Sequence, residues 1–318
     1  MTQVRRVRSL SLFDEVSLDS LRCVKKKVSY LTSSFAENRH FECDLCRGLK
    51  HSVIQPLNIR LGIERTKYDV VKCKNCKLLS LYPIPTEEEL ENIYADYLNT
   101  SNRCEVEHQR VNIYREKLRK LTQYTSGKRL LDIGAGLGTF IKCAKEFGFQ
   151  AVGIEYEKEQ CKNARERYNI DLIDRDVESI HKSLPRAAFD VINMNHVLEH
   201  VRSPRKLLEI CYSLLSADGI LLIEVPNQFH NIINEVTYYF TKKFQYPRNS
   251  LHHLYFFSIS TVKKYMEVGH YEILEMNQFR PRIDKKSVCQ MLPRNCYRYI
   301  TSQLDIGGGS FIEIYARK

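Results

Sequence analysis

Four of the eleven cysteines stand in two pairs with the spacing of a metal site. Two residues separate Cys43 from Cys46, and two separate Cys73 from Cys76. Each C-x-x-C turn points two thiolates at one place, and two such turns match the tetrahedral coordination of Zn²⁺. Four sulfur ligands leave no open position, so the zinc is expected to be structural. Two disulfides or a redox dithiol fit less well, because the short span strains a disulfide and neither pair opens a βαβ helix.

A glycine-rich turn within residues 129–140 is a second candidate site. Gly134, Gly136 and Gly138 follow a short apolar run and precede a helical apolar pattern. Such a turn lets the backbone approach a ligand that lies at a helix N-terminus. A dinucleotide fingerprint, G-x-G-x-x-G, would need a glycine where this chain has Thr139, so a nucleotide-type cofactor other than a dinucleotide is favoured.

Carboxylates and imidazoles follow two further apolar runs. Glu155 ends the next expected strand, where a carboxylate can accept hydrogen bonds from both hydroxyls of a ribose. His196, Glu199 and His200 come just after residues 189–194. A neutral imidazole is the natural general base near pH 7. The alternative for each histidine is a buried, hydrogen-bonded side chain without a catalytic role.

The elements that must position these residues alternate between strand and helix from residue 128 onward. Strands are expected at 130–133, 151–155, 171–173, 189–194, 220–225, 273–276 and 311–315, and helices at 140–147, 159–168 and 204–215. This alternation predicts an α/β fold in which helices cover both faces of a parallel sheet. Ligands of such sheets bind at the carboxyl ends of the strands, where the candidate residues stand.

These motifs, in this order, resemble class I methyltransferases that depend on S-adenosylmethionine (SAM). The matching segments are Asp132-x-Gly-x-Gly-x-Gly, Glu155, residues 189–201 (FDVINMNHVLEHV), residues 215–227 (LSADGILLIEVPN) and residues 252–258 (HHLYFFS). The cysteine pairs, followed by Pro-x-Pro and Ile-Tyr-x-x-Tyr, resemble the N-terminal zinc ribbon fused to many bacterial members. The resemblance implies a Rossmann-like sheet, mostly parallel with the last strand antiparallel, preceded by a small zinc ribbon.

The resemblance implies SAM as the cofactor. Asp132 and the glycine turn would hold its methionine end, although Asp132 could instead hydrogen-bond the amides of the turn. Asp176 matches the family position that receives the adenine amino group, and Asp174 is the competing choice. The expected cofactor-binding residues are Asp132, Gly134, Gly136, Gly138, Glu155, Asp176, Val177 and Asn195.

By the same resemblance, Leu198-Glu-His200 lies where the methyl group is delivered. Methyl transfer needs alignment and often removal of a proton from the nucleophile. We expect His200 to be the base and Glu199 to orient it or to contact substrate, with His196 as a third candidate. Related quinone-pathway O-methyltransferases place Glu and His here around Mg²⁺, but two ligands from one turn do not establish that site.

Three segments are expected to choose the substrate. In related sugar C-methyltransferases, tyrosines after the ribbon reach the substrate, which makes Tyr94 and Tyr97 candidates; a core stripe of an amphipathic helix is the alternative. Residues 226–256, rich in aromatic residues and histidines, should roof the pocket. The insert 279–303 is basic and suits an anionic group on the substrate. Its basic residues are Arg280, Arg282, Lys285, Lys286, Arg294 and Arg298.

Composition bounds the organisation of the chain. Its 318 residues, 43% of them hydrophobic, include neither an apolar run long enough for a membrane span nor a signal-peptide core, so we expect a soluble, cytoplasmic protein. The expected parts are a basic extension (1–40), the ribbon (41–84), a helical linker (85–125) and the SAM domain (126–318). The net charge of +11 is dispersed along the chain.

The favoured function is methylation of a small molecule, such as a sugar, a nucleotide-linked sugar or another envelope or secondary-metabolite intermediate. The alternative is an RNA methyltransferase that uses the ribbon and the basic surface. Neither an Asn/Asp-Pro-Pro-Tyr/Phe segment nor a Pro-Cys nucleophile follows residue 192, and no aromatic stripe interleaves the basic residues, which disfavours nucleic acid. A third hypothesis is a zinc protein that binds SAM without catalysis. The acceptor atom and the oligomeric state stay open.

Overall fold

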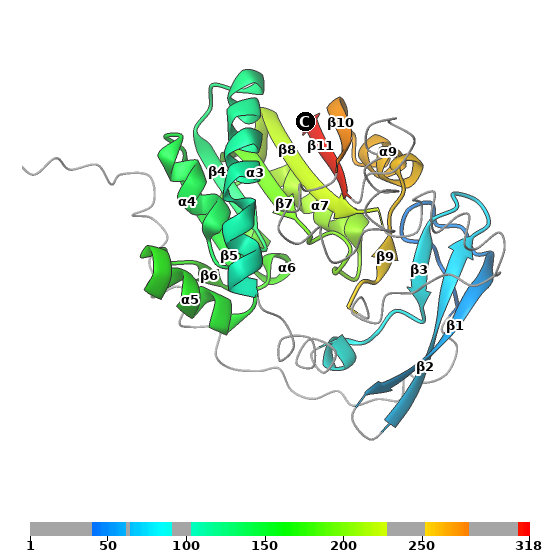
Figure 1. Cartoon of the computed structure of the whole chain (residues 1–318). Helices are drawn as coiled ribbons and strands as arrows, with labels where there is room; N and C mark the ends of the chain where they lie inside the picture. The colour runs from blue at the N-terminus through cyan, green and yellow to red at the C-terminus, as the bar shows by residue number, and fades with distance from the viewer. Residues whose placement is uncertain (1–39, 62–63, 91–102, 228–251, 280–310) are drawn as a thin grey trace, which may run out of the picture. The chain divides into compact units, whose positions relative to one another are not determined.

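The computed structural model describes residues 40–61, 64–90, 103–227, 252–279 and 311–318 (Figure 1). All of them belong to the compact unit His40–Lys318. None of the helices in these ranges is both long and apolar enough to cross a membrane.

The ribbon region forms a small antiparallel sheet with the order β1-β2-β3-β9. Its first three strands are β1 (His51–Leu61), β2 (Glu64–Cys73) and β3 (Leu79–Tyr82). The fourth, β9 (Tyr255–Phe256), comes from the opposite half of the chain and pairs Phe256 with Leu79. The ribbon sheet is therefore completed by a strand from beyond the predicted ribbon.

The large sheet has seven strands in the order β10-β11-β8-β7-β4-β5-β6. These strands are β4 (Arg129–Ile133), β5 (Gln150–Glu155), β6 (Ile173–Asp174), β7 (Phe189–Asn195), β8 (Leu215–Pro226), β10 (Glu272–Phe279) and β11 (Phe311–Arg317). All pairs from β8 to β6 are parallel, and β11 is antiparallel to both neighbours. The predicted mostly parallel sheet with an antiparallel last strand is confirmed.

Helices lie on both faces of the large sheet, as the alternation predicted (Figure 1). They are α3 (Arg103–Tyr124), α4 (Thr139–Glu146), α5 (Lys158–Tyr168), the short α6 (Val177–Ile180) and η1 (His181–Ser183), α7 (Pro204–Leu214) and α9 (Ile259–Val268). Alternate residues of β8 separate the two cores, because Leu222 packs with α3 and α4 whereas Leu221 packs with α7 and α9.

The helices that flank the candidate site begin at well-defined caps. Ser203 caps α7 by accepting a hydrogen bond from the Lys206 amide, and Pro204 occupies the first turn. Ser258 and Thr261 form a reciprocal capping box at the start of α9. The chain therefore leaves β7, passes through residues 196–203, and enters α7 at a position set by a side-chain cap.

Candidate functional site

The glycine turn joins β4 to α4 at the carboxyl edge of the large sheet. Gly134, Gly136 and Gly138 all have positive φ, at 70°, 53° and 73°. A Cβ on Gly134 would lie 2.5 Å from Cγ2 of Val197, so a side chain is also excluded there by contact. The amide of Gly134 donates to the carbonyl of Ile154 over 2.9 Å. The turn thus lies directly against the loop that follows β7.

Glu155 is held at the same edge by backbone amides. Its Oε2 accepts from the amide of Gly136 at 2.8 Å, and its Oε1 accepts from the amide of Glu157 at 2.9 Å. The carboxylate is therefore oriented by the glycine turn before any ligand binds. Asp132 is buried, and its Oδ1 accepts from Asn193 Nδ2 at 2.6 Å. The amides of Gly134 and Gly136 donate to acceptors on β5.

Asp174 and Asp176 occupy neighbouring positions after β5. Asp174 ends β6 in register with Glu155. Asp176 is the N-cap of α6 and accepts from the Ser179 amide at 3.0 Å, while Val177 is buried beneath it. Capping explains the position of Asp176 without a ligand, so the choice between the two aspartates stays open.

His196 bridges two buried carboxylates. Its Nδ1 lies 3.2 Å from Oε1 of Glu199, and its Nε2 lies 2.8 Å from Oε1 of Glu224. Burial alone would lower the pKa of His196, but its hydrogen bonds to both carboxylates outweigh burial and raise the pKa above the usual value. A protonated imidazole is a poor proton acceptor. The two carboxylates facing its ring nitrogens therefore favour the protonated form of His196.

Glu224, on β8, is the centre of a charge cluster that we did not predict. It is fully buried and forms ion pairs with Arg110, Lys117 and His196. Burial alone would raise the pKa of Glu224, but Lys117 and His196, together with Arg110, hold it well below its usual value. Lys117 also donates to Asn195 Oδ1 at 3.1 Å, which ties the expected cofactor residue Asn195 to the cluster. A lone glutamate inside the apolar run ILLIEV was the available signal.

His200 has a defined tautomer. Its Nδ1 lies 3.0 Å from the carbonyl oxygen of His252, and because a carbonyl can only accept, Nδ1 carries the proton. The other ring nitrogen, Nε2, lies 3.7 Å from Oε1 of Glu199. The other oxygen of Glu199, Oε2, is buried and has no hydrogen-bond partner among the described residues.

Two further imidazoles surround His200. Its ring is stacked on that of His252 at 4.9 Å between centroids and 13° between planes, and it meets His253 edge-on at 4.7 Å. Burial and neighbouring imidazoles hold the pKa of His253 well below its usual value, so it is neutral at pH 7. The sequence placed His252 and His253 only in the expected roof of the pocket.

The three imidazoles are not arranged as a metal centre. Their ligand atoms lie within 4.8 Å of one another. However, a metal lies close to the plane of each imidazole that binds it, and the nearly parallel rings of His200 and His252 share no such point. The stacking of these two rings therefore disfavours a metal ion shared by them.

The four cysteines of the two C-x-x-C pairs do converge. The Sγ atoms of Cys43 and Cys76 are 3.5 Å apart, and those of Cys46 and Cys73 are 3.6 Å apart. Sulfurs of a tetrahedral zinc site lie about 3.8 Å apart when each is about 2.3 Å from the ion. The contact with Cys43 lowers the pKa of Cys76 to about 5. The set therefore fits a closed four-sulfur site.

The two cysteine turns repeat one local geometry. The residue after each second cysteine, Arg47 or Lys77, has a positive φ, and its amide donates to the carbonyl of the first cysteine. The amide of that first cysteine in turn donates to the carbonyl of Gly48 or Leu78. This repetition is why two distant sequence pairs present their sulfurs in the same way.

Several expected site residues lie outside the described residues. They are Tyr94, Tyr97, most of the expected pocket roof and the six basic residues of the insert 279–303. The strand ends that flank the insert are described, and Phe311 is in register with both Phe279 and Pro226 at the carboxyl end of β8. The insert therefore leaves and rejoins the sheet at the edge that carries the glycine turn.

A family model described as "Methyltransferase domain" matches residues 106–275, just over half of the chain. Among curated proteins, the ubiquinone biosynthesis O-methyltransferase of Haemophilus ducreyi is 28% identical over 110 residues, which are 32% of this chain and 47% of that protein. The enzyme of the same name from Coxiella burnetii is 27% identical over 157 residues, 47% of this chain and 66% of that protein. The chain thus spans between about half and two thirds of these relatives.

Among solved structures, the 1,6-didemethyltoxoflavin-N1-methyltransferase of Burkholderia thailandensis aligns with a TM-score of 0.52 and 15% identity, covering 83% of this chain and 99% of that one. That structure contains 1,6-didemethyltoxoflavin and S-adenosylhomocysteine. At this identity the likeness shows the fold alone.

The chain belongs to the methyltransferase-domain family and has the Rossmann-like fold of class I SAM-dependent methyltransferases. The predictions of an enzyme of this class and of its sheet are therefore confirmed.

Proposed function

We propose that the protein transfers the methyl group of SAM to a small molecule, with His200 as the general base. The observation that carries the proposal is the contact between the glycine turn and the catalytic loop, which we define as residues 196–203. Val197 of this loop lies where a Cβ of Gly134 would stand, so the cofactor turn and the expected base share one edge of the sheet. Alignment of the reacting groups is the main requirement of methyl transfer.

The residues at this edge suit the parts of SAM. Asp132 and the positive-φ glycines would hold the methionine end, and the pre-oriented carboxylate of Glu155 would take the ribose hydroxyls. Asp176 or Asp174 would receive the adenine amino group beside the buried Val177, and Asn195 would close the methionine side. When bound, SAM supplies an electrophilic methyl group.

The base has the geometry that its role needs. The carbonyl of His252 fixes a proton on Nδ1 of His200, so the proton of an O–H or N–H nucleophile would go to Nε2. Glu199 is oriented by His196 through Oε1 and offers the buried Oε2 as an acceptor for a donor on the substrate. His196 itself serves as a positioning cation in this proposal.

We further propose that Cys43, Cys46, Cys73 and Cys76 hold a structural Zn²⁺. The spacing of the sulfurs and the repeated turns support this assignment. The four thiolates close the site, so zinc would take no part in methyl transfer.

The acceptor in this proposal is a small molecule with an ionisable hydroxyl or amine. The names of the relatives support an O-methyl acceptor, and the sugar or nucleotide-linked sugar expected from the ribbon resemblance stays a hypothesis. An anionic group on the acceptor would suit the basic insert, as the sequence suggested.

The test combines labelled SAM with a metabolite extract, read by mass spectrometry. The wild type should label a small molecule, and His200→Ala should lower its turnover by about a hundredfold, the usual contribution of a general base, with SAM affinity unchanged. His270→Asn, which removes an exposed imidazole, is the control and should keep full turnover. Unchanged turnover in His200→Ala would remove the base. Label in RNA with a steep salt dependence would favour the nucleic-acid alternative.

A further inference from the structure

Asp44, between the two cysteines of the first C-x-x-C turn, reaches out of the ribbon. Its Oδ1 accepts from Ser203 Oγ at 2.5 Å, and its Oδ2 accepts from the Arg205 amide at 3.0 Å and from the Tyr265 hydroxyl at 2.9 Å. Ser203 and Arg205 begin α7, and Tyr265 lies on α9. A carboxylate at a helix N-terminus is stabilised by the helix dipole and by unpaired amides. One ribbon side chain thus holds two helices of the SAM domain.

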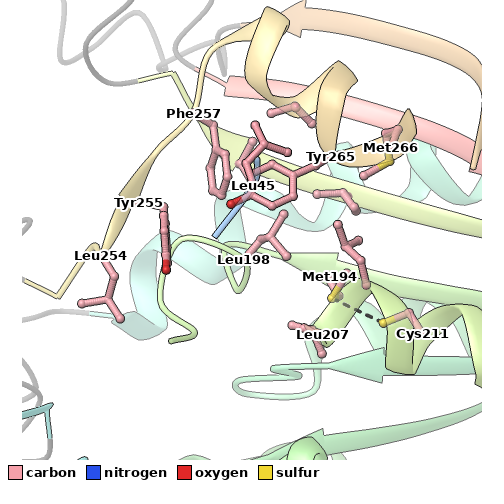
Figure 2. Close-up of a cluster of buried hydrophobic side chains, with 14 of the residues drawn as sticks. Leu45, Met194, Leu198, Leu207, Cys211, Leu254, Tyr255, Phe257, Tyr265 and Met266 are labelled. Carbon is pink, nitrogen blue, oxygen red and sulfur yellow. Dashed lines mark hydrogen bonds between the residues drawn. The ribbon is translucent and has the colours of Figure 1, made fainter. Parts of the chain in front are cut away.

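The next residue, Leu45, makes the same connection through packing. It is 1% exposed and lies in the core that also contains Leu198 of the catalytic loop. Figure 2 shows Leu45 among the side chains of Leu198, Phe257 and Tyr265. The tip of the cysteine turn is therefore inserted into the core beneath the loop that carries Glu199 and His200.

Main-chain hydrogen bonds connect the ribbon sheet to the same loop. The amide of Leu81, on β3, donates to the carbonyl of Leu254 at 2.8 Å, and the amide of Leu254 donates to the carbonyl of Glu199 at 2.7 Å. Leu254 stands two residues after His252, whose carbonyl sets the tautomer of His200. The ribbon strand, the histidine pair and the catalytic loop are thus joined in series.

We propose that Asp44 is a positioning residue through which the ribbon's cysteine turn sets the place of the catalytic loop. It contacts neither cofactor nor acceptor in this proposal; it acts through Ser203 and Arg205, which fix the end of the loop where α7 begins. The catalytic importance of the loop rests on the proposed function. The connection between Asp44 and the start of α7 rests only on the hydrogen bonds. A merely structural carboxylate would affect stability without a selective effect on the loop or on turnover.

The test uses the full-length, zinc-loaded protein with Asp44→Asn and Asp44→Ala, and Glu42→Gln as the matched control. Glu42 is an exposed carboxylate on the same turn that pairs with Arg47. In Asp44→Ala, we expect kcat to fall and amide exchange in residues 199–206 and 252–256 to rise, each by about tenfold, as for loss of a charge-assisted hydrogen bond. Exchange in residues 130–136, SAM affinity and zinc stoichiometry should stay unchanged. Asp44→Asn should be intermediate, and Glu42→Gln should match the wild type.

Ser203→Ala gives a second reading, because it removes one partner of Asp44, together with the side-chain cap of α7, without altering the ribbon. It should raise exchange in residues 199–206 but leave residues 252–256 protected, since Asp44 keeps its hydrogen bond from Tyr265 on α9, the helix that follows them. The proposal is overturned if amide exchange in Asp44→Ala matches the wild type in both residues 199–206 and residues 252–256. It is also overturned if exchange rises equally in residues 130–136. If no acceptor is found for the wild type, the proposed function fails, but the exchange measurements still decide the link.

Discussion

His196 and His200 are four residues apart in the loop between β7 and α7. Their ring nitrogens face different partners. His196 lies between the carboxylates of Glu199 and Glu224, which favour its protonated form. His200 instead donates a hydrogen bond from Nδ1 to the backbone carbonyl of His252, and its Nε2 lies 3.7 Å from a single carboxylate oxygen, Oε1 of Glu199. From the sequence, both histidines are candidate bases. Only the partners of each ring, which the structure shows, favour a charged His196 and leave His200 as the candidate base.

The first prediction concerns Glu224. Glu224→Gln removes the one carboxylate that pairs with all three of Lys117, Arg110 and His196, and it leaves Lys117 with Glu313 and His196 with Glu199. We expect a loss of about 3–5 kcal/mol in the free energy of unfolding, as for breaking a buried ion pair. Denaturant titration at pH 7 measures this loss. Glu272→Gln, on an exposed position of β10, is the control and should stay within about 0.5 kcal/mol of the wild type. Equal midpoints for the two variants would contradict the prediction.

The second prediction is the pH dependence of this cluster. The raised pKa of His196 means that its contribution is full below the ordinary histidine pKa of about 6.5 and is lost as the pH rises through the folded value. The lowered pKa of Glu224 means that its contribution is full above about 4.3 and is lost as the pH falls through the folded value. The stability difference between the wild type and His196→Asn should therefore be largest between these values and shrink at alkaline pH. A difference that grows with pH would show that His196 is neutral.

At the scale of elements, the turn between β4 and α4 requires glycine for two reasons, its positive φ angles and the closeness of Val197 to Gly134. We predict that Gly134→Ala lowers SAM affinity by about tenfold or more, because it combines left-handed strain of about 1–2 kcal/mol with a clash against Val197. Gly148→Ala is a matched control, since Gly148 has a φ of 78° but nothing within 4 Å of its Cβ position. It should lose stability but bind SAM as the wild type does. Calorimetric titration with SAM separates the two variants.

The elements of the large sheet followed from hydrophobic periodicity, with errors at their ends. β6 is two residues long and begins where its predicted strand ended, because only Ile173 and Asp174 pair with β5. β8 begins at Leu215 because that residue pairs with Phe189, before the apolar run. β9 was not predicted, since two residues carry no periodic signal and its partner Leu79 is distant in sequence.

The sequence predicted those parts of the candidate site whose residues lie close together in one short motif. The glycine turn, Glu155 and the Glu199–His200 pair are short local patterns whose carboxyl-edge position follows from the parallel sheet. The contacts of His200 with His252, and of Asp44 with α7, join segments that only folding brings together. No spacing within the sequence encodes such contacts, so the structure was needed to find them.

At the scale of the whole molecule, the ribbon and the SAM domain share one core. The same cluster of buried residues contains Cys43 and Leu81 of the ribbon and Leu221 of the large sheet. We therefore predict that a strong chelator, which would remove the proposed zinc, lowers the melting temperature of the entire protein in a single transition. Calorimetry with and without chelator tests this, and added Zn²⁺, but not Mg²⁺, should restore the original temperature. A separate low-temperature transition would show that the ribbon melts alone.

The pairing of β3 with β9 also has a consequence for how the chain is made. As the chain leaves the ribosome, the ribbon's first three strands emerge long before Tyr255 and Phe256, which close the edge at β3. Until then β3 presents unpaired backbone groups, a template on which nascent chains can associate. Closing this edge requires a contact of long sequence separation, which slows folding. The first three strands of the ribbon are thus synthesised well before the strand that completes their sheet.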